Sequence, residues 1–128
     1  MNKKLLHNCI DMALRNNNPE SHPQYYNYIH YSFIFQNNRM VSWGTNMAGP
    51  AKYGYKSYMK IHSEYIAWVK SKGFLDRRDS FELVNIRLSK RGTLKISRPC
   101  DCCMGYLKQM GCRKIYYTTE NGFSILIP

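Results

Sequence analysis

Apolar residues recur along the chain at two spacings, one helical and one strand-like, and this predicts an α/β protein. Helical spacing occupies three segments: residues 3–16, residues 60–72, and a stretch that begins at Pro99. Runs rich in β-branched and aromatic residues predict five strands: 28–36, 39–44, 81–88, 115–119 and 123–127. Helices interleaved with strands favour a three-layer α/β/α sandwich around a five-stranded mixed sheet.

Turn-forming residues separate these segments. Asn37-Asn38 and Glu120-Asn121-Gly122 predict tight hairpin turns, so the last two strands should pair antiparallel as a C-terminal β-hairpin. Gly73 and Gly111 are expected to stop the second and third helices. In the third helix the inward positions should be Met104, Leu107 and Met110. Three further stretches predict irregular structure: loops at 19–27 and 44–56, and a turn at 90–92 leading into 93–97.

Length and composition fit one globular domain, residues 1–128. A chain of 128 residues, 44% of them hydrophobic, can bury a core without disulfides. No apolar run approaches the roughly 20 residues that a membrane span needs, and the first residues do not resemble a signal peptide. We therefore expect an intracellular protein without a membrane partner. The net charge of +11 favours a polyanionic partner or a phosphorylated ligand.

Cysteines are clustered rather than spread along the chain. Cys100, Cys102 and Cys103 lie within four residues, a grouping that points to metal or redox chemistry. Cys9 and Cys112 lie elsewhere in the chain and are expected to behave as small buried hydrophobic residues.

One histidine and two of these cysteines have the chemistry of a catalytic zinc site. His62, Cys100 and Cys103 offer one nitrogen and two sulfurs, and a catalytic zinc keeps three protein ligands with a fourth position open to water. Free amides at a helix start also favour the thiolate form of a cysteine. A zinc-bound water has a pKa near ~7, and Glu64, two residues after the histidine, could move its proton.

Other interpretations of this cluster stay open. Cys102 could replace Cys103, although residues two apart on a helix face different directions, which favours Cys103. The Cys-x-x-Cys pair alone could be a redox pair. A structural zinc site would need a fourth ligand, for which the chain offers Cys102, Cys112, His7, His22 and His30. It would also leave Glu64 without a role.

His62-Ser63-Glu64 and Pro99-Cys100-Asp101-Cys102-Cys103 resemble the signature of the zinc-dependent cytidine/deoxycytidylate deaminase superfamily, His-x-Glu followed by Pro-Cys-x-x-Cys. The resemblance covers Phe33 to Thr119 in element order. It implies a cytidine deaminase fold, zinc as cofactor on His62, Cys100 and Cys103, and Glu64 as general acid/base. It also implies that Asn46 binds the sugar or base of the substrate. Ser63 stands where the family often has alanine.

The resemblance implies hydrolysis of the amine of cytosine or adenine, and small members of the family act more often on cytosine. Cations crowd the segment before Cys100: Arg87, Lys90, Arg91, Lys95 and Arg98. Tyrosines crowd the loops and first hairpin: Tyr25, Tyr26, Tyr28, Tyr31, Tyr53, Tyr55 and Tyr58. Cations interleaved with aromatic rings suit a single strand, so single-stranded DNA or RNA is the expected partner, with Arg87, Lys90 and Arg91 as contacts.

Three alternatives remain for the partner and the activity. The first is a free cytosine nucleoside or nucleotide, such as CMP or dCMP, since the C-terminal hairpin also resembles that of free-cytidine deaminases. The second is adenine in RNA. The third is a binding module that zinc stabilises without catalysis. The sequence does not predict the oligomeric state.

Overall fold

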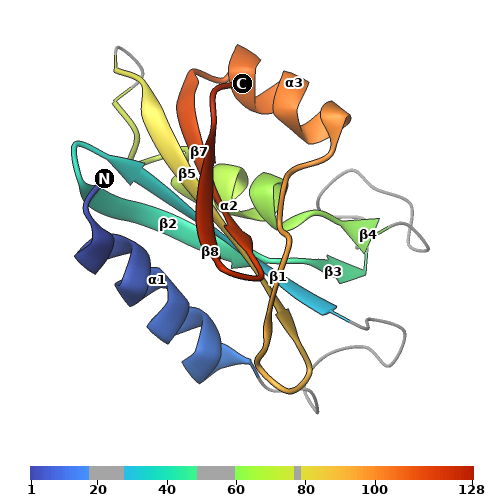
Figure 1. Ribbon diagram of the computed structural model, residues 1–128. Coiled ribbons are helices and arrows are strands. Elements are labelled where there is room, and N and C mark those ends of the chain that lie inside the picture. Colours follow the sequence, from blue (N-terminus) through green and yellow to red (C-terminus); the bar gives the residue numbers. More distant parts are fainter. Residues whose placement is uncertain (18–27, 49–59, 77–78) are drawn as a thin grey trace.

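The computed structural model describes residues 1–17, 28–48, 60–76 and 79–128, and its centre is a mixed β-sheet (Figure 1). The helices are α1 (Lys3–Asn16), α2 (Ser63–Ser71) and α3 (Asp101–Gln109). The longer strands are β1 (Tyr28–Gln36), β2 (Arg39–Thr45), β5 (Phe81–Ser89), β7 (Cys112–Thr119) and β8 (Gly122–Leu126). Three strands have two residues each: β3 (Met47–Ala48), β4 (Lys60–Ile61) and β6 (Leu94–Lys95).

The sheet follows the order β2-β1-β5-β7-β8, with β6 paired to β5 outside this path. β1 runs antiparallel to both of its neighbours, β5 and β7 are parallel, and β8 returns antiparallel to β7. The predicted mixed sheet of five strands and its C-terminal hairpin are therefore confirmed. The short strand β6 is an addition that the sequence pattern did not predict.

Helices cover both faces of the sheet, which confirms the three-layer α/β/α sandwich. Alternate residues of β1 point to opposite faces. On one face Tyr31 and Phe33 pack in the same cluster as Cys9 of α1. On the other face Ile34 packs with Ala67 of α2 and with residues of β5, α3 and β7. None of the described helices is long and apolar enough to cross a membrane.

Helix α1 begins and ends where the sequence predicts, but the other two helices begin later. Residues 60–61, expected to be helical, form strand β4 and pair with β3. His62 then has extended backbone (φ −72°, ψ 147°) as the N-cap of α2. Likewise Cys100 is the extended N-cap of α3, which starts after Pro99 rather than at it. Strand β7 starts at Cys112, three residues before its predicted start at Ile115, because it pairs from there with β5.

The two predicted hairpin turns are confirmed. Asn37 and Asn38 both have positive φ, 54° and 62°, as a two-residue hairpin turn requires. Gly111 follows α3 with φ 97° and ends that helix as expected. Of the three inward positions predicted in α3, Leu107 is fully buried, while Met104 and Met110 are half-buried against the same cluster. The loop predicted at 19–27 lies outside the described residues, as do residues 49–56 of the loop predicted at 44–56. The loop prediction is wrong for residues 44–45, which belong to β2, and for residues 47–48, which form β3 and pair with β4.

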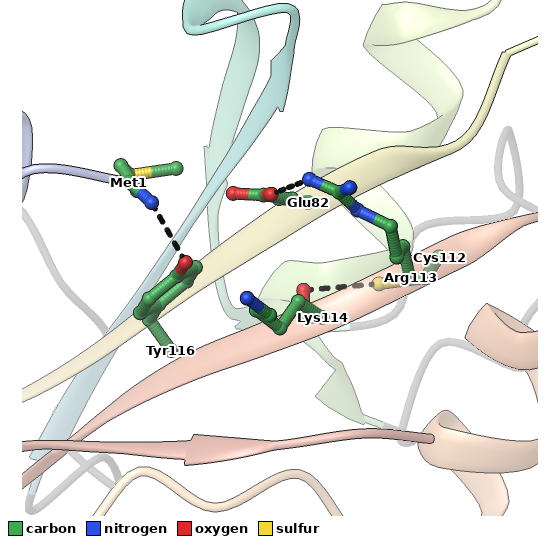
Figure 2. A network of polar contacts seen from close by, with 6 residues as sticks. All are labelled: Met1, Glu82, Cys112, Arg113, Lys114 and Tyr116. Carbon is green, nitrogen blue, oxygen red and sulfur yellow. Dashed lines mark hydrogen bonds and ion pairs between the residues drawn. The ribbon is translucent and has the colours of Figure 1, made fainter.

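Polar contacts tie the amino-terminal ends of β5 and β7 together (Figure 2). Arg113 of β7 forms an ion pair with Glu82 of β5, and the terminal amine of Met1 donates to the Tyr116 hydroxyl at 2.9 Å. Glu82 and Arg113 lie at the start of the parallel strands, whereas Tyr116 lies in the middle of β7. The opposite end of the sheet, where β5 and β7 finish, is the end near the candidate site described below.

Gly44 of β2 packs closely against α2. A Cβ atom at this position would lie 2.6 Å from Ile66 Cγ2 and 2.8 Å from the Ala67 nitrogen. We expect Gly44→Ala to lower the free energy of unfolding by about 1–3 kcal/mol, because the helix must move to relieve the overlap.

Urea unfolding measures this effect, with Gly105→Ala as the matched control. Gly105 lies in α3, and a Cβ there meets no atom within 4 Å. The control should therefore be stabilised by up to about 1 kcal/mol through helix propensity. Equal effects of the two substitutions would contradict the close packing of β2 on α2.

Candidate metal centre and active site

The N-terminal ends of α2 and α3 lie on the same side of the molecule (Figure 1). His62 is the N-cap of α2 and Cys100 is the N-cap of α3. The Sγ atom of Cys100 accepts a hydrogen bond from the Cys103 amide at 3.4 Å. Two helix N-termini thus direct their positive dipole ends toward one place. Such an end favours the thiolate form of a cysteine.

His62, Cys100 and Cys103 form one cluster. The Nδ1 atom of His62 lies 3.2 Å from the Cys103 sulfur and 3.7 Å from the Cys100 sulfur. One ligand atom from each residue lies within 4.8 Å of the others, close enough to bind a single metal ion. Cys102, which the sequence left as an alternative ligand, is exposed on α3 and is not part of this cluster.

Aromatic packing holds the two helices beside each other. Tyr106 of α3 lies 5.9 Å from Tyr65 and 6.5 Å from Trp68 of α2, measured between ring centroids. Trp68 also stacks on Phe81 at the start of β5, at 5.8 Å. These contacts fix the distance between helices whose first residues carry the cluster, although 38 residues separate His62 from Cys100.

The electrostatics of the cluster fit a cation. Burial, the charge of Glu64 and contact with Cys100 all raise the pKa of the Cys103 thiol. A bound divalent ion would offset these effects and favour the thiolate. One imidazole and two thiolates are ligands that zinc prefers, and three protein ligands leave a fourth position for water.

Glu64 lies beneath this cluster rather than at the surface. Its side chain is only 4% exposed, and its Oε1 atom accepts a hydrogen bond from Ser63 Oγ at 2.9 Å. Ser32 Oγ of β1 lies 3.5 Å from the same oxygen and 2.7 Å from Ser63 Oγ. One carboxylate oxygen is therefore held by hydroxyl groups. A buried carboxylate beside a candidate metal site can transfer protons without competition from bulk water.

Asn46 lies between β2 and β3, where the sequence predicts a loop. Its Oδ1 accepts from the His30 amide at 2.9 Å, and its own amide donates to the His30 carbonyl at 3.3 Å. The side-chain carbonyl thus joins β2 to β1. Only the amide nitrogen of this side chain can then serve a substrate as a donor.

The basic residues before Cys100 do not all lie at the cluster. Lys90 and Arg91 are exposed at the turn after β5, and Figure 1 shows this turn far from the start of α3, with the extended segment 94–100 between them. Arg87 is half-buried and donates to the Ile96 carbonyl at 3.3 Å, so it supports the segment that leads to Cys100.

Most of the tyrosines that the sequence suggests as contacts for a single strand lie outside the part of the chain whose side chains are described. Tyr31 is the exception, and the prediction is wrong for it. Its side chain is fully buried in the core beneath α1, where its hydroxyl donates to Asn17 Oδ1 at 3.1 Å. The alternation of β1 places this ring on the face opposite Ser32, so it cannot stack on a base.

The two isolated cysteines are buried, as the sequence predicts. Burial raises the pKa of Cys9 and of Cys112 to about 12, which keeps both as neutral thiols. Both pack in the hydrophobic clusters of the sheet.

Sequence reasoning missed a set of polar residues buried beneath the cluster: Ser32, Asn85, Ser97 and Thr118. Each contributes to hydrogen bonds that connect β1, β5 and β7 under the ends of α2 and α3. No local pattern marks them, because serine, threonine and asparagine at these spacings are common on exposed faces of strands. Their burial follows from the tertiary fold alone.

No model of a known protein family and no curated protein sequence matches this chain. Solved structures do. A cytidine deaminase from Burkholderia pseudomallei matches with a TM-score of 0.64 and 14% identity over 99% of this chain and 93% of its own. A dCMP deaminase from the cyanophage S-TIM5 matches with a TM-score of 0.62 and 19% identity over 93% and 86%. The same phage protein in complex with dCMP and dUMP matches with a TM-score of 0.59 and 17% identity over 90% of this chain and 81% of its own. The chain thus has the α/β fold of cytidine and dCMP deaminases.

Proposed function

We propose that this protein is a zinc-dependent hydrolase that deaminates cytosine to uracil. One observation carries the proposal: the ligand atoms of His62, Cys100 and Cys103 lie within 4.8 Å of one another, with the buried carboxylate of Glu64 beside them. Among the described residues this cluster has three members rather than four, as in a catalytic site. The cytidine and dCMP deaminases that share the fold support the same reaction.

Different residues of the chain bind the metal, transfer protons and bind the substrate. Zinc, when bound by His62, Cys100 and Cys103, would supply a water whose pKa is lowered to about 7. Glu64 accepts the proton of the attacking water as oxygen adds to C4 of the base. It passes that proton to the ring nitrogen. It then takes the proton of the new C4 hydroxyl and gives it to the amino group, so the C4–N bond breaks, ammonia leaves and C4 becomes a carbonyl. Asn46 binds the sugar or base through its amide nitrogen.

For the substrate we favour cytosine in single-stranded DNA or RNA. The chain carries a net charge of +11, and exposed cations mark both ends of the segment that leads to the cluster, Lys90 and Arg91 at one end and Arg98 at the other. His62 and Cys100 are exposed, so a base presented by a polymer can reach them. Cations along a segment that leads to an open site suit a phosphate backbone that extends away from the site.

A free nucleotide is the second candidate substrate, and one comparison favours it. The cyanophage dCMP deaminase was solved with dCMP and dUMP, and it has the same fold over most of both chains. A small substrate would need only the cluster, Glu64 and Asn46. The basic segment would then have no role in turnover.

Direct assays separate the two candidates. The zinc-loaded protein is incubated with cytidine, dCMP, single-stranded DNA and RNA containing cytosine, and matched strands containing adenine instead. We expect uracil in the cytosine-containing strands. Turnover of dCMP or cytidine alone would reject the polymer substrate, and the absence of turnover on every substrate would reject the deaminase.

The basic turn gives an independent prediction about the polymer. Lys90→Ser with Arg91→Ser should weaken binding to a single-stranded oligonucleotide by about tenfold at low salt and flatten the salt dependence, because two fewer phosphates are neutralised. Fluorescence anisotropy across a salt series measures both effects.

The matched control removes the same charge from another surface. Lys3→Ser with Lys4→Ser changes two exposed lysines at the start of α1. This variant should keep most of the affinity. Equal losses in the two double variants would mean that net charge alone, rather than the turn, attracts the polymer.

A further inference from the structure

A chain of buried polar groups crosses the sheet beneath the candidate metal centre, and the proposed chemistry does not account for it. Asn85 of β5 lies at its centre and is 2% exposed. Its Nδ2 donates to the Ser97 carbonyl at 3.3 Å, so its Oδ1 is the acceptor for Ser32 Oγ, at 2.6 Å. Ser32 in turn lies 2.7 Å from Ser63 Oγ, which binds Glu64.

On its other side, Asn85 is hydrogen-bonded to the segment that leads to the cysteines. Ser97 is buried three residues before Cys100, and its hydroxyl donates to the Asn85 carbonyl at 2.7 Å. Its amide donates to the Thr118 carbonyl at 3.0 Å, and the Thr118 amide donates to Ser97 Oγ at 2.7 Å. The segment that enters α3 is therefore fixed to both β5 and β7 at this residue.

The side chains at the centre of this face of the sheet are apolar, and those next to the site are polar. Ser32 and Asn85 are register partners on β1 and β5, and the partners two positions along are Ile34 and Leu83, both fully buried. The same face thus changes from apolar to polar as it approaches Glu64. Burying such groups stabilises the fold little compared with apolar packing, so their arrangement favours a role in placing the site.

We propose that Asn85 is a positioning residue, whose amide joins the two halves of the metal centre. One half is α2 with His62 and Glu64, reached through Ser32 and Ser63, and the other is the segment that carries Cys100. The part of this inference that concerns turnover rests on the proposed deaminase function. The part that concerns metal geometry does not require any turnover.

Cobalt(II) titration of the full chain tests the part of the inference that concerns metal geometry. Its visible absorption reports the geometry of a cysteine-containing site directly. Asn85→Leu keeps the number and branching of the side-chain heavy atoms and removes the hydrogen bonds in both directions. It should weaken cobalt affinity by about tenfold and alter the absorption bands, as loss of outer hydrogen bonds at metal sites does. Ser71→Ala is the matched control, since Ser71 is fully buried and its hydroxyl donates to the Trp68 carbonyl at the far end of α2.

Steady-state kinetics of Ser32→Ala tests the part of the inference that concerns turnover. This variant breaks the link from Asn85 to α2 and leaves the link to Ser97 in place, so it should weaken cobalt binding less than Asn85→Leu does. It should also lose about tenfold in kcat with little change in KM, because Glu64 is less firmly placed. Thermal unfolding should drop similarly in Ser32→Ala and Ser71→Ala. A structural role alone would lower the unfolding temperature equally in both without the loss in kcat.

The outcomes separate this inference from the proposed function. If the unchanged chain binds cobalt but deaminates nothing, the proposed function fails, and the cobalt affinity of Asn85→Leu still decides the positioning role. If Asn85→Leu binds cobalt with the affinity and spectrum of Ser71→Ala, the positioning role is overturned. If the unchanged chain binds no cobalt at all, both proposals fall.

Discussion

Replacing Glu64 with glutamine should give a folded protein that still binds metal but deaminates about 10²–10⁴ times more slowly. The amide keeps an oxygen that can accept from Ser63, so this hydrogen bond survives. It cannot take a proton from water or return one to the base, and a general acid/base contributes about this factor. The free energy of unfolding should change by less than about 1 kcal/mol.

Three measurements on the same preparation check this result: uracil formation, zinc content by elemental analysis, and thermal unfolding. Glu82→Gln is the matched control, because Glu82 is also a largely buried carboxylate but pairs with Arg113 at the opposite end of the sheet. The control should lose up to about 1 kcal/mol of stability and keep its turnover. A Glu64→Gln protein with more than a tenth of the original rate would remove Glu64 from the proton transfers.

Local chemistry explains which parts of the fold could be predicted. The Asn37-Asn38 turn needs only two residues that tolerate positive φ, and the alternation of β1 needs only its own side chains. The start of α2 is different. Lys60 and Ile61 continue the helical spacing, yet they pair with β3, a strand more than ten residues earlier in the chain. Tertiary pairing here overrides a local pattern, and no window around residue 60 contains that information.

The site shows the same division between local and distant information. The residue types and spacing of His62, Glu64, Cys100 and Cys103 gave the candidate cluster, and the fold brings them together. Asn85 and Ser32 had no such signal, since they depend on the register between β1 and β5. The charge of Arg87 predicts a substrate contact, and the fold adds a hydrogen bond from its guanidinium to the Ile96 carbonyl that the sequence did not predict. The charge of a side chain predicts that it attracts anions, but it does not predict which groups the side chain contacts in the folded protein.

Cys103→Ser should abolish stoichiometric zinc and turnover together. The serine hydroxyl is a far weaker zinc ligand than a thiolate, and two remaining ligands do not hold the ion against competition. Loss of the metal also removes the stability that binding adds, which is about 4 kcal/mol when free metal exceeds its dissociation constant a thousandfold. The unfolding temperature should therefore fall by roughly 10 °C or more.

A chelator distinguishes loss of the metal from damage by the substitution. Chelation of the unchanged protein should lower its unfolding temperature to about that of Cys103→Ser, and the chelator should have no further effect on the variant. Cys102→Ser is the matched control, because this neighbouring thiol is exposed and outside the cluster. It should keep zinc, turnover and sensitivity to the chelator. If instead Cys102→Ser loses the metal while Cys103→Ser retains it, the third ligand is Cys102, and the first turn of α3 must rotate to bind the ion.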